Sequence, residues 1–206
     1  SNTPGFETGE LKTLELLKQA FQQSDQSKQF IDARILLTRE QIDNANKPVL
    51  FVELASGQNG TLTPYPGQGI GQTWLGADGA TITMERGVLK ASRGMGNDLM
   101  GSIVAMPEWS KIMHISETYN RKLSYITGNN NISEHIFKCK TQRFEKKELI
   151  EIWKVTFEVT KFEETCKNKD LKIKNTYYID NRGIVRKSSQ YHGDTIGQIN
   201  TERLDR

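Results

Sequence analysis

The C-terminal half of the chain alternates apolar and polar side chains with a period of two, and this pattern restricts the possible folds most strongly. A strand with one dry face and one solvated face produces this period, whereas a helix does not. The apolar positions are Trp153, Val155, Phe157 and Val159 in residues 149–163, and Leu171, Ile173, Tyr177 and Ile179 in residues 171–179. The alternation therefore predicts a mainly β fold.

Turn residues separate these and further strand-like segments. Gly128-Asn129-Asn130-Asn131 joins residues 119–127 to 132–144, and Asp180-Asn181-Arg182-Gly183 joins residues 171–179 to the return strand 184–191. Glycine supplies the positive φ that a tight hairpin turn requires. Consecutive strands with short turns form an antiparallel meander, and a long twisted meander curls so that its edges are covered. We expect a closed or partly open β-barrel-like domain.

The N-terminal half adds strands and a helix to this arrangement. Residues 49–54 have the composition of a buried strand, and residues 79–84 and 87–92 have that of a hairpin. Leucine and phenylalanine recur at helical spacing in residues 10–23, which predicts an amphipathic helix packed outside the sheet. Residues 98–104 are expected to form a short helix that begins near Asp98.

Length and composition fit one domain over residues 1–206, with a β-rich body at about 45–193. The segment 55–73 is rich in Gly, Pro and Thr and is expected to be an irregular crossing or a short edge strand. The chain has 28 basic and 25 acidic residues and a net charge of +3. This balance argues against nucleic acid as a partner but is compatible with an anionic one. No apolar stretch has the length of a membrane span, and no signal peptide is recognisable.

No catalytic or metal-binding motif is recognisable in the sequence. The glycine-rich stretches 67–71 and 94–96 do not complete a dinucleotide-binding fingerprint, and the three histidines lack the spacing of a zinc site. The adjacent Glu163 and Glu164 would point to opposite faces of a strand, so they could not flank one substrate bond. We therefore predict no catalytic residue, no cofactor and no metal.

Two groups of residues are candidates for ligand binding. Four aromatic residues are candidates because flat aromatic faces suit sugar rings: Trp74, Trp109, Trp153 and Tyr191. Trp74 and Trp109 lie at expected loop borders, although core packing is the commoner role of tryptophan. Trp153 is expected in the core. Arg93, Asn97 and Asp98 are expected at a strand-to-turn junction near a surface groove, as a contact site for an acidic glycan or a partner. The alternative is a capped turn in which Asp98 accepts backbone N–H groups.

Several segments together resemble the group 4 capsule polysaccharide lipoprotein family, of the YjbF/GfcB type. The resemblance extends over about residues 45–193. Met95 and Met100 stand where leucine is expected in the family, which is a conservative change. The segments are GVLKASRGMGNDLMGS at 87–102, Trp74 followed by Asp78-Gly79, FEETC at 162–166 and NTYYIDNRGIVRKSSQY at 175–191.

The resemblance implies a β-barrel-like lipoprotein that faces the periplasm from the outer membrane. It implies a role in capsule or exopolysaccharide production or export, with polysaccharide or other secretion proteins as partners. It implies no catalytic residues. The N-terminal lipid-bearing cysteine of such a protein is absent from this sequence, so the anchor is an expectation.

The two cysteines, Cys139 and Cys166, permit one disulfide in an oxidising compartment. The periplasmic location that the resemblance implies favours this bridge, and we therefore predict it. The strand register argues against it. A hairpin that turned near Lys146 would place Cys139 opposite Trp153 and leave Cys166 beyond the reach of a disulfide.

Two other functions remain open beside an accessory or binding role. A polysaccharide-modifying enzyme would need a cleft with perturbed carboxylates. A carrier of hydrophobic ligands would need an empty barrel interior, and an interior filled by Trp153, Phe157 and Tyr177 would exclude it.

Overall fold

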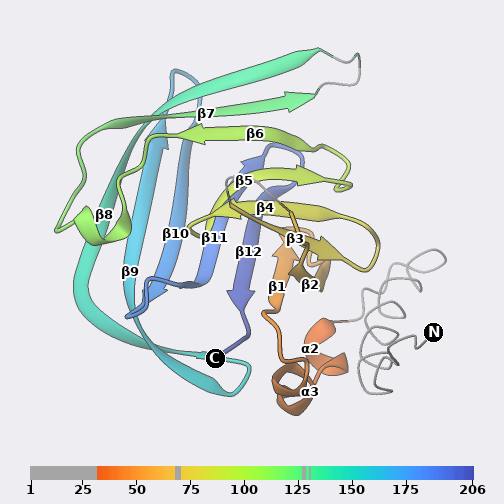
Figure 1. The fold of residues 1–206 in the computed structure, drawn as a ribbon. Helices are drawn as coiled ribbons and strands as arrows, with labels where there is room; N and C mark the ends of the chain where they lie inside the picture. Colours follow the sequence, from red (N-terminus) through yellow and green to blue (C-terminus); the bar gives the residue numbers. More distant parts are fainter. Residues whose placement is uncertain (1–31, 68–70, 127–128, 130) are drawn as a thin grey trace.

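The computed structural model describes residues 32–67, 71–126, 129 and 131–206. Twelve strands form one antiparallel sheet that curls into a nearly closed barrel (Figure 1), which confirms the predicted fold class. The strands are β1 (Leu50–Leu54), β2 (Asn59–Pro64), β3 (Gln72–Gly76), β4 (Thr81–Glu85), β5 (Val88–Arg93), β6 (Leu99–Val104), β7 (Tyr119–Ile126), β8 (Ile132–Ile152), β9 (Val155–Lys167), β10 (Lys172–Asp180), β11 (Val185–Gly193) and β12 (Gly197–Arg203). Two short helices, α2 (Ala33–Leu36) and α3 (Arg39–Asn44), precede the sheet, and a 3-10 turn η1 (Trp109–Lys111) lies between β6 and β7.

The sheet begins at β5 and ends at β6, so these two strands form the seam of the barrel. Its order is β5-β4-β3-β2-β1-β12-β11-β10-β9-β8-β7-β6. Hydrogen bonds that involve side chains join β5 to β6 across the seam, where the two strands are not paired as sheet neighbours. Leu99 N donates to Ser92 Oγ (2.9 Å), and the Arg93 guanidinium donates to Leu99 O (3.2 Å). Covering the two edges in this way protects them from pairing with other chains.

Several predicted strands are confirmed within a few residues, including β1, β7, β10, β11 and the β4–β5 hairpin. The helix expected at residues 98–104 is wrong, because this segment is strand β6. Asp98 caps a turn, since its carboxylate accepts Gly94 N (3.0 Å) and Met95 N (2.9 Å). Beyond the turn, Leu99–Val104 pairs with β7, and this tertiary pairing outweighs the local helix signal.

The β8–β9 hairpin turns later than the sequence suggests. Its turn residues are Trp153 and Lys154, with φ of 48° and 65°. In a two-residue hairpin turn, positive φ at both central residues matches the right-handed twist of the flanking strands. Asn and Gly usually occupy these two positions. This turn contains neither residue, so the sequence carries no turn signal at 153–154. The turn predicted near Lys146 is therefore wrong. At that position β8 instead has a bulge, between Arg143 and Lys147.

Two strands depart from expectation because they are polar. The segment 55–73 was expected to be irregular or an edge, yet β2 pairs on both sides, with β1 and β3. Strand β12 lies beyond the expected β-rich body and occupies the middle of the sheet between β1 and β11. Only Ile199 of β12 is a buried apolar side chain, so period-two hydrophobicity gave little signal there.

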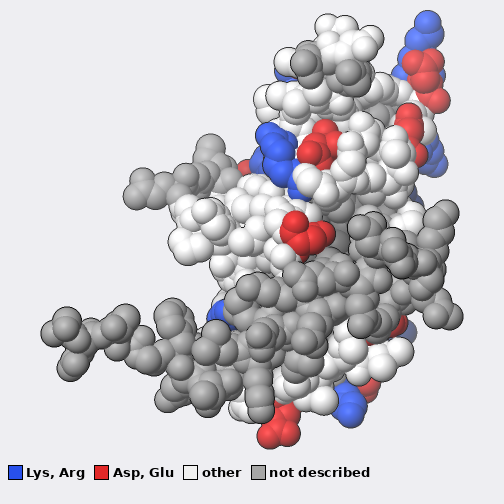
Figure 2. All heavy atoms as spheres, turned by 90° about the vertical axis from the view of Figure 1, so that its right-hand side faces the viewer, with Lys and Arg blue, Asp and Glu red and all other residues white. Residues whose placement is uncertain are grey.

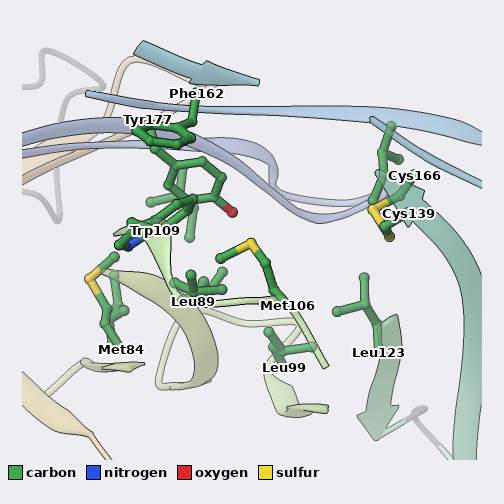
Figure 3. Packing of buried hydrophobic residues seen from close by; sticks show 14 of the residues in the cluster. Met84, Leu89, Leu99, Met106, Trp109, Leu123, Cys139, Phe162, Cys166 and Tyr177 are labelled. Carbon is green, nitrogen blue, oxygen red and sulfur yellow. A yellow bond between two sulfur atoms is a disulfide. The ribbon is translucent and has the colours of Figure 1, made fainter. Parts of the chain in front are cut away.

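The main hydrophobic core fills the barrel. Trp109 packs between the rings of Phe162 and Tyr177 on one wall and the side chains of Met84 and Leu89 on the other (Figure 3), with ring centroids 5.2 Å and 4.8 Å from Phe162 and Tyr177. Aromatic contacts at such separations contribute about 0.5–1.5 kcal/mol beyond the area that they bury.

A second apolar cluster lies apart from the main core. It joins helices α2 and α3 to Phe51 of β1, Ile152 at the hairpin tip and Leu204. The Trp153 ring meets Phe51 edge-on at 5.8 Å, and the Arg186 guanidinium lies 4.3 Å from the centre of the Phe157 ring. Trp153 therefore lies in a turn rather than on a strand, and it belongs with Phe157 to this second cluster. Of the three side chains whose presence in the interior would exclude a carrier, only Tyr177 lies in the main core.

The helix expected at residues 10–23 lies outside the described residues. Within the described part of the chain, no helix has the length and apolarity needed to span a membrane.

Candidate functional site

The two ends of the barrel differ. We call mouth A the end that carries the β5–β6, β7–β8, β9–β10 and β11–β12 connections, and mouth B the opposite end. At mouth B, the connection 105–118 places Trp109 in the interior, where its indole N–H donates to Arg86 O (3.0 Å). At mouth A, a pocket of about 590 Å³ reaches from the rim toward the core. A smaller pocket of about 260 Å³ lies at mouth B beside Met84 and Arg86, so mouth A leaves the larger of these two spaces to a ligand.

Aromatic rings and polar groups line the mouth A pocket together. The lining residues are Asn97, Leu123, Tyr125, Ile126, Ser133, His135, Phe137, Asn168, Asp170, Leu171, Tyr191, Asp194 and Thr195. The Tyr125 and His135 rings meet edge-on at 5.9 Å. The charged groups of the lining are the carboxylates of Asp170 and Asp194. Such a surface offers flat apolar faces beside hydrogen-bonding groups, which suits a hydroxyl-rich ligand better than an anion.

Two tyrosines of the pocket are fixed by hydrogen bonds. The Tyr125 hydroxyl donates to His192 O (2.5 Å), and the Tyr191 hydroxyl donates to Asp194 Oδ1. Burial and the nearby Asp194 carboxylate raise the pKa of both tyrosines. Their hydroxyls therefore stay protonated over the whole physiological range and hold both rings in place.

The three residues of the predicted contact site, Arg93, Asn97 and Asp98, have different surroundings in the structure. Asn97 lines the mouth A pocket and donates to Thr195 Oγ1 (3.1 Å). Asp98 caps its own turn, which is the structural alternative that the sequence left open. Arg93 is exposed and donates to the backbone oxygens of Ser92 (2.7 Å) and Leu99 (3.2 Å) at the barrel seam.

The two candidate tryptophans are both buried. Trp74 is 3% exposed and lies inside strand β3, with the Arg203 guanidinium 4.9 Å from its ring centre. Trp109 is 8% exposed and fills the interior near mouth B. Neither indole offers its face to solvent, so neither forms a surface platform for a sugar. Two tyrosines do line the mouth A pocket. Tyr191 was among the aromatic candidates from the sequence, whereas Tyr125 was not.

A buried polar network lies on the inner face of the wall formed by strands β7 to β10, and it was not anticipated. Glu164 is fully buried and accepts from Arg121 Nη2 at 3.0 and 2.9 Å and from Arg121 Nε at 3.2 Å. Tyr119 (2.8 Å), Asn175 (2.7 Å) and Tyr177 (3.3 Å) also donate to this carboxylate. Six hydrogen bonds saturate both oxygens, which compensates the burial of the charge.

Arg121 and the two tyrosines of this network retain their protons. Burial opposes the charge of Arg121, but Glu164 outweighs this effect and raises the pKa of the guanidinium. Burial and the Glu164 charge also raise the pKa of Tyr119 and Tyr177, so both phenols remain donors. The network therefore ties β7, β9 and β10 together and leaves no free lone pair on the carboxylate for proton transfer.

The disulfide joins the same walls of the barrel. Cys139 and Cys166 are direct cross-strand partners in β8 and β9, with Cα atoms 4.0 Å apart, and their sulfurs are bonded. Moving the hairpin turn from Lys146 to residues 153–154 removes the register objection. Their sulfurs also lie near the Glu164 carboxylate, but because the cysteines are bonded to each other this group does not have the free thiolates of a metal site.

Comparison with known proteins identifies the family. The sequence profile described as "Group 4 capsule polysaccharide lipoprotein gfcB, YjbF" matches residues 14–204. This chain belongs to that family. The resemblance in the glycine segment, in FEETC and in the tyrosine strand is thereby confirmed, and the match extends beyond the expected body to include β12.

Structural comparison supports the fold of this capsule lipoprotein family member. The crystal structure of the hypothetical lipoprotein YmcC from Escherichia coli K12 superposes with a TM-score of 0.71, at 17% sequence identity, over 99% of this chain and 98% of that chain. At this identity the likeness shows a shared fold. No curated protein matches the chain at a significant level.

Proposed function

We propose that this chain is a non-catalytic accessory lipoprotein at the periplasmic face of the outer membrane, and that it binds polysaccharide during capsule or exopolysaccharide production or export. The mouth A pocket carries this proposal, because it combines fixed aromatic rings with amide, hydroxyl and carboxylate groups in an accessible cavity of about 590 Å³. The family to which the chain belongs supports the link to capsule polysaccharide.

A non-catalytic role agrees with the state of the buried carboxylate. General acid–base chemistry needs a carboxyl group within reach of a substrate and able to exchange its proton. Glu164 is inaccessible, and its oxygens accept six hydrogen bonds from Arg121, Tyr119, Asn175 and Tyr177. The most enclosed acid of the barrel therefore serves to hold strands together.

The occupied interior disfavours a carrier of hydrophobic ligands. Trp109, Phe162 and Tyr177 fill the volume near mouth B, and the buried Arg121–Glu164 pair lies on the inner face of the wall formed by β7 to β9. A lipid chain would have to displace an aromatic cluster or desolvate a charged network. The mouth A pocket is the more suitable volume for a ligand, and its rim is polar.

Binding measurements with the purified protein test this function. Saturation-transfer NMR is run with polysaccharide purified from the bacterium that encodes the chain, for wild type and for Tyr191→Ala. We expect transfer to sugar protons with wild type and a clear loss with Tyr191→Ala. The matched control is Tyr178→Ala on the outer side of β10, which should bind as wild type does.

Two results would reject the proposal. One is the absence of transfer from wild-type protein. The other is tight binding of palmitate with no binding of polysaccharide, which would establish the carrier instead.

A further inference from the structure

Five lysines form a regular array on the wall of the barrel, which we call the lysine face. Cross-strand register places Lys138, Lys167 and Lys172 in one row over β8, β9 and β10. In the neighbouring row, Lys140 and Lys174 flank Thr165. Adjacent strands lie about 4.8 Å apart and alternate residues of a strand about 6.6 Å apart, so the five ammonium groups share one compact surface.

All five side chains point away from the interior. Their neighbours along the strands, among them Cys139, Cys166 and Ile173, are buried in the core, and alternation places each lysine on the opposite face. All five lysines of the lysine face are exposed.

The lysine face lacks the charge balance of the rest of the protein. The whole chain has 28 basic and 25 acidic residues, and on the side of the molecule in Figure 2 the described basic and acidic side chains are interspersed. Among the described residues, only Lys174 of the lysine face has an ion pair, with Glu163 at 2.8 Å. Like charges placed directly opposite each other destabilise a sheet, so this row has a cost that an anionic ligand would relieve.

We propose that the lysine face binds a polyanionic polysaccharide, one that carries carboxylate or phosphate groups along its chain. This inference rests on the proposed function, which makes a polysaccharide the ligand, and it adds the charge class and a second binding surface. The row crosses a curved wall of three strands. A linear polymer with repeated negative groups can follow that curvature, whereas a flat membrane would meet it only along a line.

The position of the lysine face agrees with a ligand that continues to the mouth A pocket. Lys167 and Lys172 flank the β9–β10 turn, and Asn168 and Asp170 of this turn line the pocket. A chain held by its acidic groups on the outer wall would reach the rim of mouth A directly. The pocket itself presents carboxylates, so the neutral parts of the polymer would enter it.

Binding of polygalacturonate by the full chain tests this inference. The variant Lys138→Gln/Lys167→Gln/Lys172→Gln removes one row. The control Lys146→Gln/Lys147→Gln/Lys154→Gln removes the same charge from three exposed lysines of the β8–β9 hairpin, two at the β8 bulge and one at the turn. We expect wild type to bind polygalacturonate in a salt-dependent manner and the row variant to bind at least about tenfold more weakly. The control variant, and the variant with arginine at the three row positions, should bind as wild type does.

Three outcomes would overturn the inference. Equal weakening by the row variant and the control would show an effect of net charge alone. Binding to anionic phosphatidylglycerol vesicles without binding to polygalacturonate would assign the lysine face to a membrane surface. Failure of wild type to bind polygalacturonate, while polysaccharide binding through Tyr191 persists, would reject the lysine face and leave the proposed function intact.

Discussion

At the scale of single residues, the adjacent acids Glu163 and Glu164 show how alternation separates two roles. Glu163 lies on the outer side, where it pairs with Lys161 (2.7 Å) and Lys174 (2.8 Å). Glu164 lies in the interior and pairs with Arg121. The sequence predicts that the two point to opposite faces, which is confirmed. It does not reveal Arg121 as the partner, because that pairing depends on the register of β7, β8 and β9 across 43 positions.

Substitution of the two glutamates should separate these roles. Glu164→Gln removes the charge that compensates Arg121 and leaves a buried cation, so we expect the free energy of unfolding to fall by about 3–5 kcal/mol. Glu163→Gln removes surface ion pairs and should cost less than about 1 kcal/mol. Urea unfolding followed by tryptophan fluorescence measures both. Equal effects of the two substitutions would contradict the role assigned to the network.

His192 couples stability to pH. It is fully buried, its Nε2 lies 2.8 Å from Ser92 Oγ, and its Nδ1 has no hydrogen-bond partner among the described residues. Burial lowers its pKa from 6.5 to about 4, against a smaller opposite effect of Asp98. The His192 imidazole is therefore protonated below about pH 6.5 in the unfolded chain, but only below about pH 4 in the folded chain.

We expect the free energy of unfolding to be constant above about pH 6.5 and to fall by up to about 3 kcal/mol as the pH decreases to about 4. Unfolding curves between pH 7 and pH 4.5 measure this slope before most carboxylates titrate. His192→Gln should flatten the curve in this window, and the exposed His135→Gln should not. A slope that persists in His192→Gln would show that another group causes it.

At the scale of elements, prediction succeeded where the signal was local. The strands at β7, β10 and β11 follow from alternation within each segment. The β8–β9 hairpin was misplaced because Trp153 and Lys154 adopt positive φ without the usual Asn or Gly. Strand β12 was missed because its position between β1 and β11, rather than its own hydrophobicity, makes it a strand. The mouth A pocket is assembled from strands β7, β8 and β11 and from three connections, so it has no signature in any single segment.

The disulfide between β8 and β9 gives a prediction at the same scale. It closes a loop of 27 residues, which in the chain-entropy model stabilises the fold by about 3.5 kcal/mol. The double variant Cys139→Ala/Cys166→Ala should lose about this amount, and a reductant should lower the stability of wild type but not of the variant. Two reactive thiols per chain in denatured, unreduced wild type would mean that no bridge forms, and would weaken the periplasmic assignment.

At the scale of the whole molecule, the two ends of the barrel differ in the space that they leave for a ligand, about 590 Å³ at mouth A and about 260 Å³ at mouth B. The connection 105–118 brings Trp109 into the interior near mouth B, and side chains of Ser92 and Arg93 bridge the seam. Mouth A keeps a pocket beside the lysine face. This arrangement places the lysine face and the mouth A pocket side by side, as the proposed binding of a polysaccharide requires.

The most direct test of this account is the amount of surface polysaccharide made by the bacterium. The gene is deleted and replaced by wild type, by Tyr191→Ala or by Tyr178→Ala, each produced at equal level, and polysaccharide at the cell surface is quantified per cell. The account predicts that deletion reduces surface polysaccharide, that wild type and Tyr178→Ala restore it, and that Tyr191→Ala does not. Surface polysaccharide that is unchanged by deletion, or fully restored by Tyr191→Ala, would contradict the proposed role of the mouth A pocket.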